Sequence, residues 1–120
     1  MLQTLATTLI AALSLGQVST LTWINPDRYS VRPLSTSSFE VFWRGRSTPR
    51  DFWCVAGDYA RRELGATPAT HIYRVSSLAR HIGQVTRFSL SPDGALPTGL
   101  AVIDSPRSLR VSQAQSLCGY

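Results

Sequence analysis

The sequence predicts an α+β domain in which one main helix, about residues 49–64, packs on a small, mostly antiparallel sheet. Three observations predict it. One segment has a helical period with capping residues at both ends. Several short segments alternate in polarity or carry aromatic and β-branched residues, as strands do. Turn residues separate these segments, and their order is strands, helix, then several strands, which is typical of an α+β domain.

Composition sets the first limits on function. The chain has 120 residues, a net charge of +5, 43% hydrophobic residues and 16% charged residues, which is an ordinary globular composition and excludes a disordered tail. This length fits one domain and leaves no room for a cofactor domain beside a substrate domain. The sequence has no glycine-rich phosphate loop, no zinc-ligand spacing and no nucleotide fingerprint, so we expect no cofactor and no metal.

The N-terminus predicts export. No charged side chain precedes Asp27, and residues 5–15 form an apolar stretch of the length found in signal peptides. Small residues at Ser14 and Gly16 suit cleavage before Gln17. We therefore expect a signal peptide and a periplasmic or secreted protein. An uncleaved N-terminal anchor and a buried helix of a cytoplasmic protein are the alternatives, and we expect no multi-span membrane insertion.

The predicted mature chain is one small domain with two cysteines. Removal of residues 1–16 leaves residues 17–120, and both Cys54 and Cys118 lie in that part. An even pair of cysteines in an exported chain indicates a disulfide. This disulfide would close a loop of 64 residues, for which loop entropy predicts about 4 kcal/mol of stabilisation.

Two strands are expected before the helix. Residues 28–32 read as a short edge strand ended by Pro33, and residues 39–43 as an aromatic, β-branched strand. Period-two alternation places Phe39 and Phe42 on opposite faces of the second strand. One of these faces must therefore meet something other than the main core, which could be the helix, an oligomer partner or a ligand groove.

The helix has the clearest boundaries. Thr48 suits the N-cap, Pro49 the first helical position, Asp51 the capping box and Gly65 the left-handed position after the helix. At 100° per residue the side chains divide into two faces. The apolar face carries Phe52, Trp53, Ala56, Tyr59, Ala60 and Leu64, and the polar face carries Arg50, Asp51, Cys54, Asp58, Arg61 and Arg62.

The second half of the chain reads as short strands between turns. Residues 84–90 alternate, with Thr86 and Phe88 on one side and Arg87 on the other. Residues 91–94 have the composition of a turn. The other expected strands are residues 71–75, 100–103 and 107–111, and short helical turns are expected within residues 76–83 and 112–117.

Cys54 supports an alternative, enzymatic interpretation. Arg50 and the beginning of the helix would both lower the pKa of its thiol, which favours a reactive thiolate. The order Cys54, then His81 or His71, then Asp104 resembles that of papain-like and transglutaminase-like enzymes. The segment 58–60 also resembles the helix of transglutaminase-like folds. This resemblance implies a cysteine-dependent hydrolase or acyltransferase.

Arginine supports a second alternative. All twelve basic residues are arginine, which keeps its charge and binds carboxylates and phosphates bidentately. Some of them cluster beside aromatic residues, as in surfaces that bind anionic envelope components. Export removes most access to nucleic acid, so we expect no nucleic-acid partner. The residues of this candidate surface are Arg44, Arg46, Arg50, Arg61 and Arg62.

One further resemblance covers most of the mature chain. Residues 53–60, 72–73, 88–90 and 111–114, followed by a cysteine near the end, are similar to small exported bacterial proteins of unknown function. The resemblance implies no activity. Together with the two cysteines it favours a disulfide-stabilised, non-enzymatic interaction module, whose partner would be an envelope protein or an anionic surface.

Overall fold

The computed structural model describes residues 23–24, 29–45, 47–101 and 106–119. The predicted signal peptide lies outside these ranges. Within them no helix is long and apolar enough to cross a membrane. The fold is α+β, as the sequence predicts, with one main helix and a second short one on a six-stranded antiparallel sheet.

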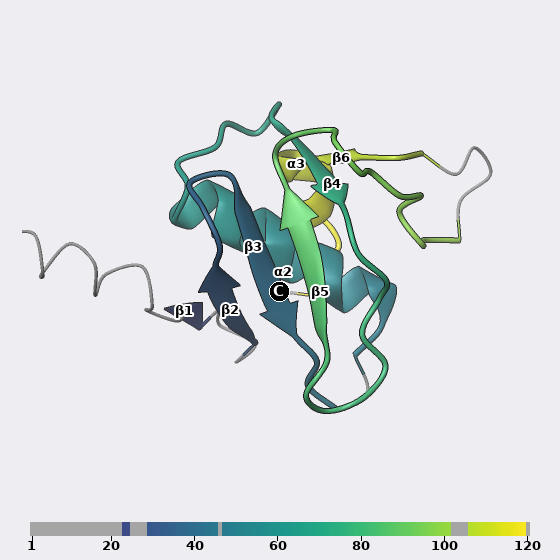
Figure 1. Ribbon diagram of the computed structural model, residues 1–120. Helices are drawn as coiled ribbons and strands as arrows, with labels where there is room; N and C mark the ends of the chain where they lie inside the picture. Colours follow the sequence, from purple (N-terminus) through teal and green to yellow (C-terminus); the bar gives the residue numbers. More distant parts are fainter. Residues whose placement is uncertain (1–22, 25–28, 46, 102–105, 120) are drawn as a thin grey trace, which may run out of the picture.

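The sheet brings together strands that are distant in sequence (Figure 1). Its order is β1-β2-β3-β5-β4-β6, and every neighbouring pair is antiparallel. The central pair, β3 with β5, is therefore interrupted in the chain by the main helix and β4. The strands are β1 (Trp23–Ile24), β2 (Ser30–Pro33), β3 (Ser38–Phe42), β4 (His71–Arg74), β5 (Val85–Ser89) and β6 (Leu109–Arg110).

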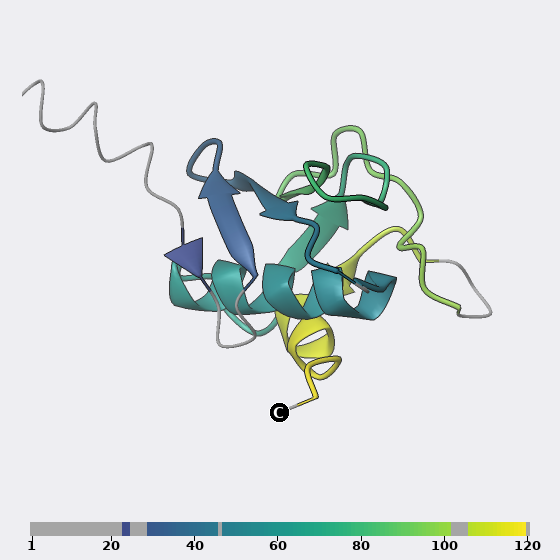
Figure 2. The ribbon, with the colours of Figure 1, turned by 90° about the horizontal axis from the view of Figure 1, so that it is seen from below.

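The two helices form layers behind the sheet. Helix α2 (Pro49–Arg62) crosses one face of the sheet, and α3 (Val111–Gln115) packs on the opposite side of α2 (Figure 2). Aromatic rings fill the space between the sheet and α2. Phe39 lies 4.5 Å from Tyr59, and Trp53 lies 5.0 Å from Phe88, between ring centroids. Trp23 of β1 covers the end of this cluster, 5.5 Å from Tyr59.

The two faces of β3 have different surroundings. Phe39 and Val41 are fully buried against α2, so the inward face of the strand meets the helix. Phe42 points to the other face, where the Arg32 guanidinium lies 5.4 Å from its ring centre. A cation over an aromatic ring is a favourable contact. In the described residues the outward face of the sheet is thus covered by side chains rather than by a second layer.

The capping residues of α2 are confirmed. The Thr48 side chain accepts a hydrogen bond from the backbone N–H of Asp51, and the Asp51 carboxylate accepts one from the backbone N–H of Thr48. Pro49 occupies the first helical position. The helix ends at Arg62, two residues earlier than predicted, and Gly65 has the left-handed φ of 68°.

The polar face of α2 is only partly exposed. Cys54 and Asp58 are 3% and 2% exposed, because α3 covers them. Gln115 of α3 donates a hydrogen bond to Asp58 at 3.2 Å, and Arg62 pairs with the same carboxylate at 3.9 Å, as its i+4 spacing predicts. Helix α2 is therefore buried on two sides.

Several strand predictions need correction. The strand expected at residues 28–32 runs over Ser30–Pro33, and it is no edge strand because β1 pairs with it. Leu100 and Ala101 are not in a strand, because the chain turns at Gly99 (φ 81°) and Thr98 accepts a hydrogen bond from Leu100 N–H. Residues 102–103 lie outside the described ranges. Residues 76–83 contain no helical turn, and the strand expected at 107–111 is reduced to β6.

Candidate functional site

The predicted disulfide is present. Cys54 on α2 is bonded to Cys118, which follows α3, and their Cα atoms are 4.9 Å apart. The bond closes a loop of 64 residues and fastens the C-terminal segment across the outer side of α2. The Asp58 carboxylate lies beside it, so that its oxygen and the two sulfurs are within 4.8 Å of one another. A metal ion at this place would need thiolates, whereas these sulfurs are bonded to each other.

The structure does not bring the candidate catalytic residues together. Cys54 is buried and faces α3. His71 is exposed on β4, on the face away from α2, and its Nδ1 is 2.9 Å from the Ser108 hydroxyl. His81 is exposed in the segment between β4 and β5. Asp104 lies outside the described residues. The cysteine-dependent alternative therefore stays a prediction.

The predicted arginine surface is divided between the two ends of α2. Arg50 lies in its first turn and lines a pocket of about 550 Å³ with Leu100 and other residues. Arg61 lies in the last turn, about 16 Å along the helix axis from Arg50. Arg62 is next to Arg61 in the chain. The Arg44 guanidinium lies 6.0 Å from the ring centre of Tyr29. Arg46 is outside the described residues. A role of these residues in binding anionic surfaces stays a prediction.

A larger pocket opens between the connection from β4 to β5 and the segment that follows β5. Its volume is about 930 Å³, and three arginines, Arg74, Arg80 and Arg87, line it. We call it the arginine pocket. None of the described residues that line it is acidic. Its other lining residues are the polar Ser76, Ser77 and Gln84, the apolar Leu78, Ala79, Val85, Leu96 and Pro97, and Gly83.

Arg74 is an inward-facing charge. It lies on β4 on the same face as the fully buried Ile72, and it is 8% exposed. Its two terminal nitrogens donate hydrogen bonds to the carbonyl oxygens of Ser76 and Pro97, whereas its buried Nε–H has no acceptor among the described residues. Burial lowers the pKa of Arg74 from its usual value, but a guanidinium stays protonated in proteins.

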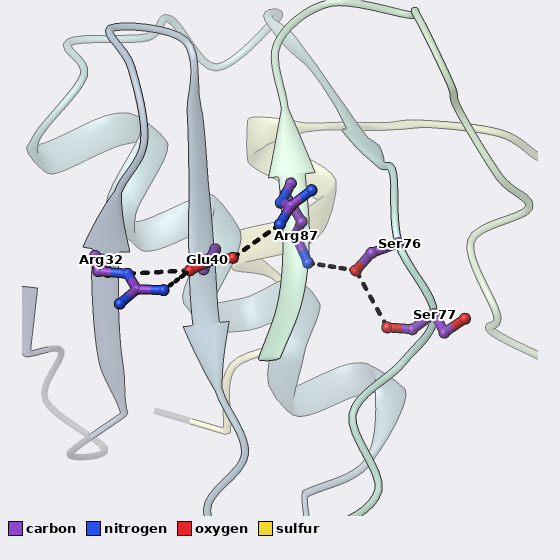
Figure 3. A network of polar contacts seen from close by, with 5 residues as sticks. All are labelled: Arg32, Glu40, Ser76, Ser77 and Arg87. Atoms are coloured by element: carbon purple, nitrogen blue, oxygen red, sulfur yellow. Dashed lines mark hydrogen bonds and ion pairs between the residues drawn. The ribbon is translucent and has the colours of Figure 1, made fainter. Parts of the chain in front are cut away.

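Arg87 is held at the edge of the pocket by a polar network on the outward face of the sheet (Figure 3). Its guanidinium donates to Glu40 at 3.0 Å, and Glu40 also accepts hydrogen bonds from Arg32. The backbone N–H of Arg87 donates to the Ser76 hydroxyl at 2.7 Å, and that hydroxyl donates to the carbonyl of Ser77. The network therefore connects the middle of the sheet to the wall of the pocket.

Glu40 is nearly buried within this network. Burial raises the pKa of the Glu40 carboxyl, but hydrogen bonds from Arg32 and Arg87 and their positive charges lower it more, so that the net pKa lies below its ordinary value. The carboxylate therefore stays ionised and is shared by two arginines.

Sequence reasoning missed the arginine pocket. One signal was present, because alternation in the strand at residues 71–75 places Arg74 on the same face as the apolar Ile72. The convergence of residues 76–87 with Leu96 and Pro97 had no such signal, because it depends on how two connections fold beside the sheet.

Comparisons with protein-family models, with curated proteins and with solved structures give no match.

Proposed function

We propose that this protein is an exported, non-enzymatic binding module whose fold is stabilised by the Cys54–Cys118 disulfide. The observation that carries the proposal is the disulfide itself, which is built into the packing of α2 against the C-terminal segment. Disulfides persist in the periplasm and outside the cell and are rare in the reducing cytoplasm. The same bond keeps Cys54 from acting as a nucleophile, because nucleophilic attack requires a free thiolate.

The arginine pocket supports binding over catalysis. Its volume is within the range of small-molecule sites, and it combines apolar walls with a few polar groups. Ser76 and Ser77 carry hydroxyl groups there, but a serine nucleophile needs an adjacent general base. None of the described lining residues is a histidine or a carboxylate. The arginine and serine side chains of the pocket can hold a ligand by charge and hydrogen bonds.

Intact mass spectrometry of the protein recovered from the cell envelope tests the proposal. We expect a mass that lacks about the first 16 residues, as signal-peptide cleavage predicts, and no alkylation before reduction. The matched control is a variant without residues 2–16, which should stay in the cytoplasm and carry two alkylatable thiols. A full-length mass with two alkylatable thiols in the native protein would contradict the proposal and would make Cys54 the leading candidate nucleophile.

A second candidate function is binding to an anionic envelope surface through the end of α2. Arg61 and Arg62 are adjacent and exposed there. Charge reversal of both residues, Arg61→Glu with Arg62→Glu, should abolish salt-dependent retention on vesicles that contain anionic lipid. Unchanged retention of the double variant would exclude this end of the helix as the binding surface.

A further inference from the structure

The arginine pocket has an excess of positive charge. Three guanidinium groups line it, and the described lining residues include no carboxylate. Glu40 is the nearby acid that contacts one of them, and it is shared between Arg87 and Arg32. One carboxylate therefore compensates only part of the charge of this cluster, and the charge of Arg74 has no carboxylate against it among the described residues.

Arg74 gives the clearest indication of a ligand site. Burying a cation without a counterion is costly, and the two carbonyl groups that accept from Arg74 carry no net charge. Its Nε–H is a buried donor without an acceptor in the described chain. An anion in the pocket would act as a counterion to the Arg74 guanidinium.

Arg80 places a second charge at the rim of the same pocket. The backbone N–H of Arg80 donates to the Gln84 side chain at 2.8 Å, which fixes the chain at this point. The residue is exposed, and its guanidinium has no hydrogen-bond or ion-pair partner among the described residues. It is thus positioned to meet an anion at the entrance. Guanidinium groups suit oxyanions because their planar donors match two oxygens at once.

The apolar lining residues indicate the chemistry of the part of the ligand that is not the anion. Leu78, Val85 and Leu96 supply apolar surface beside the charged groups. The volume of about 930 Å³ is much larger than an inorganic anion requires. The pocket therefore suits a molecule in which an oxyanion is attached to an apolar body.

We propose that the arginine pocket binds a small organic oxyanion, a carboxylate or phosphate ester with an apolar group, through Arg74 and Arg80. This inference deepens the proposed binding function and rests on it. Arg87 completes the charged wall while it remains paired with Glu40. The shared chemistry is recognition of a planar or tetrahedral oxyanion by guanidinium groups.

The test is a heteronuclear NMR titration of the oxidised protein with four probes: phenyl phosphate, phenylacetate, inorganic phosphate and the neutral benzyl alcohol. We expect saturable shifts of the Arg74 Nε–H signal and of the backbone signals of Ser77 and Arg80 with phenyl phosphate or phenylacetate. Whichever of the two binds more tightly identifies the oxyanion class. Inorganic phosphate should bind more weakly, and benzyl alcohol should not move the Arg74 signal.

Two substitutions connect the binding to the pocket. Arg80→Gln should weaken the Kd for the preferred probe by about tenfold, because it removes a charge-assisted contact. Arg110→Gln is the matched control, because it removes the same charge from an exposed position on β6 that does not line the pocket, and it should leave the Kd unchanged. Arg74→Lys keeps the buried charge but removes the forked donors, and it should weaken binding while near-ultraviolet circular dichroism shows an unchanged fold.

Two outcomes would overturn the inference. One is the absence of saturable shifts with both aromatic anions, and the other is equal weakening by Arg80→Gln and Arg110→Gln, which would indicate only general electrostatic attraction. Either result, combined with a cleaved and disulfide-bonded protein in the envelope, would reject the anion site and leave the proposed binding module standing. A cytoplasmic, reduced protein that binds the anions would reject the proposed exported module and leave the anion site standing.

Discussion

Glu40 keeps an ionised carboxylate in a nearly buried position on the outward face of the sheet. Its side chain is 5% exposed, whereas Arg32 and Arg87 on either side of it are about half exposed. The three residues belong to β2, β3 and β5, so their contacts cross two neighbouring strand pairs. A single carboxylate therefore contributes to the stability of three strands.

We expect Glu40→Gln to lower the free energy of unfolding by about 1.5–3 kcal/mol, the range for hydrogen bonds to charged groups. The amide keeps the size of the side chain but leaves the charges of Arg32 and Arg87 without their counterion. Urea unfolding at pH 7, followed by circular dichroism, measures the difference. An unchanged midpoint would mean that water stabilises the two arginines as well as the carboxylate does.

The same carboxylate predicts a dependence of stability on pH. The pKa of Glu40 in the folded protein is lowered from its ordinary value of 4.5. Its contribution is therefore fully present above that value and is lost as the pH falls through the lower folded pKa. The difference in stability between the native protein and Glu40→Gln should shrink on acidification from pH 6 to pH 3. A constant difference would contradict the ionised state assigned to this residue.

Helix α2 shows which parts of an element can be predicted from sequence. Its capping residues act within a few positions of one another, so Thr48, Pro49 and Asp51 indicated where it begins. Its aromatic face was equally clear from the helical period. The second buried face gave no such signal in the helical period. It is covered by α3, a helix of five residues with the mostly polar sequence VSQAQ. Such a short segment gives no amphipathic signal.

Gly57 of α2 lies directly against α3. A Cβ atom there would lie 2.9 Å from the Cβ of Ala114 and 2.9 Å from the backbone nitrogen of Gln115. Gly57→Ala would gain about 1 kcal/mol of helix propensity, but the backbone of α3 cannot turn away as a flexible side chain can. We expect a net loss of stability of about 1–2 kcal/mol from this overpacking, measured by thermal or urea unfolding.

Gly45 provides the control for this prediction. In the described structure, no atom lies within 4 Å of a Cβ atom placed at Gly45. Gly45→Ala should therefore leave stability nearly unchanged. If Gly57→Ala were as stable as Gly45→Ala, the close packing of α3 on α2 would be wrong.

At the scale of the whole molecule, the disulfide is the main covalent constraint. It closes 64 residues, and the loop-entropy relation assigns it about 4 kcal/mol, which is comparable to the total stability of a small domain. We expect Cys54→Ala and Cys118→Ala to lower the free energy of unfolding equally, and the double variant to lose no more than either. Urea unfolding of the three variants and of the reduced native protein measures these values.

Unequal effects of the two single substitutions would contradict this expectation. A larger loss for Cys54→Ala would show that this side chain contributes through its packing against α3 as well as through the bond. Additive losses in the double variant would show that the two sulfurs are not joined in the folded protein.

The sequence predicted more of the fold than of the site, for a physical reason. The pattern of β3 and β5 follows from period-two alternation. The pairing of the cysteines follows from the expectation that an even pair in an exported chain forms a disulfide. The arginine pocket is formed where residues 76–87 meet Leu96 and Pro97. Neither segment has a regular period, so their meeting cannot be read from one sequence.

The sheet order also determines how the chain can reach this structure. Glu40 and Arg87 contact each other across 47 positions, because α2 and β4 lie between β3 and β5 in the chain. Closing so long a loop costs entropy before any contact compensates for it. Two local units, β2–β3 with α2 and the β4–β5 hairpin, can form first. The pairing of β3 with β5 then joins them, so this late, long-range step is expected to set the folding rate.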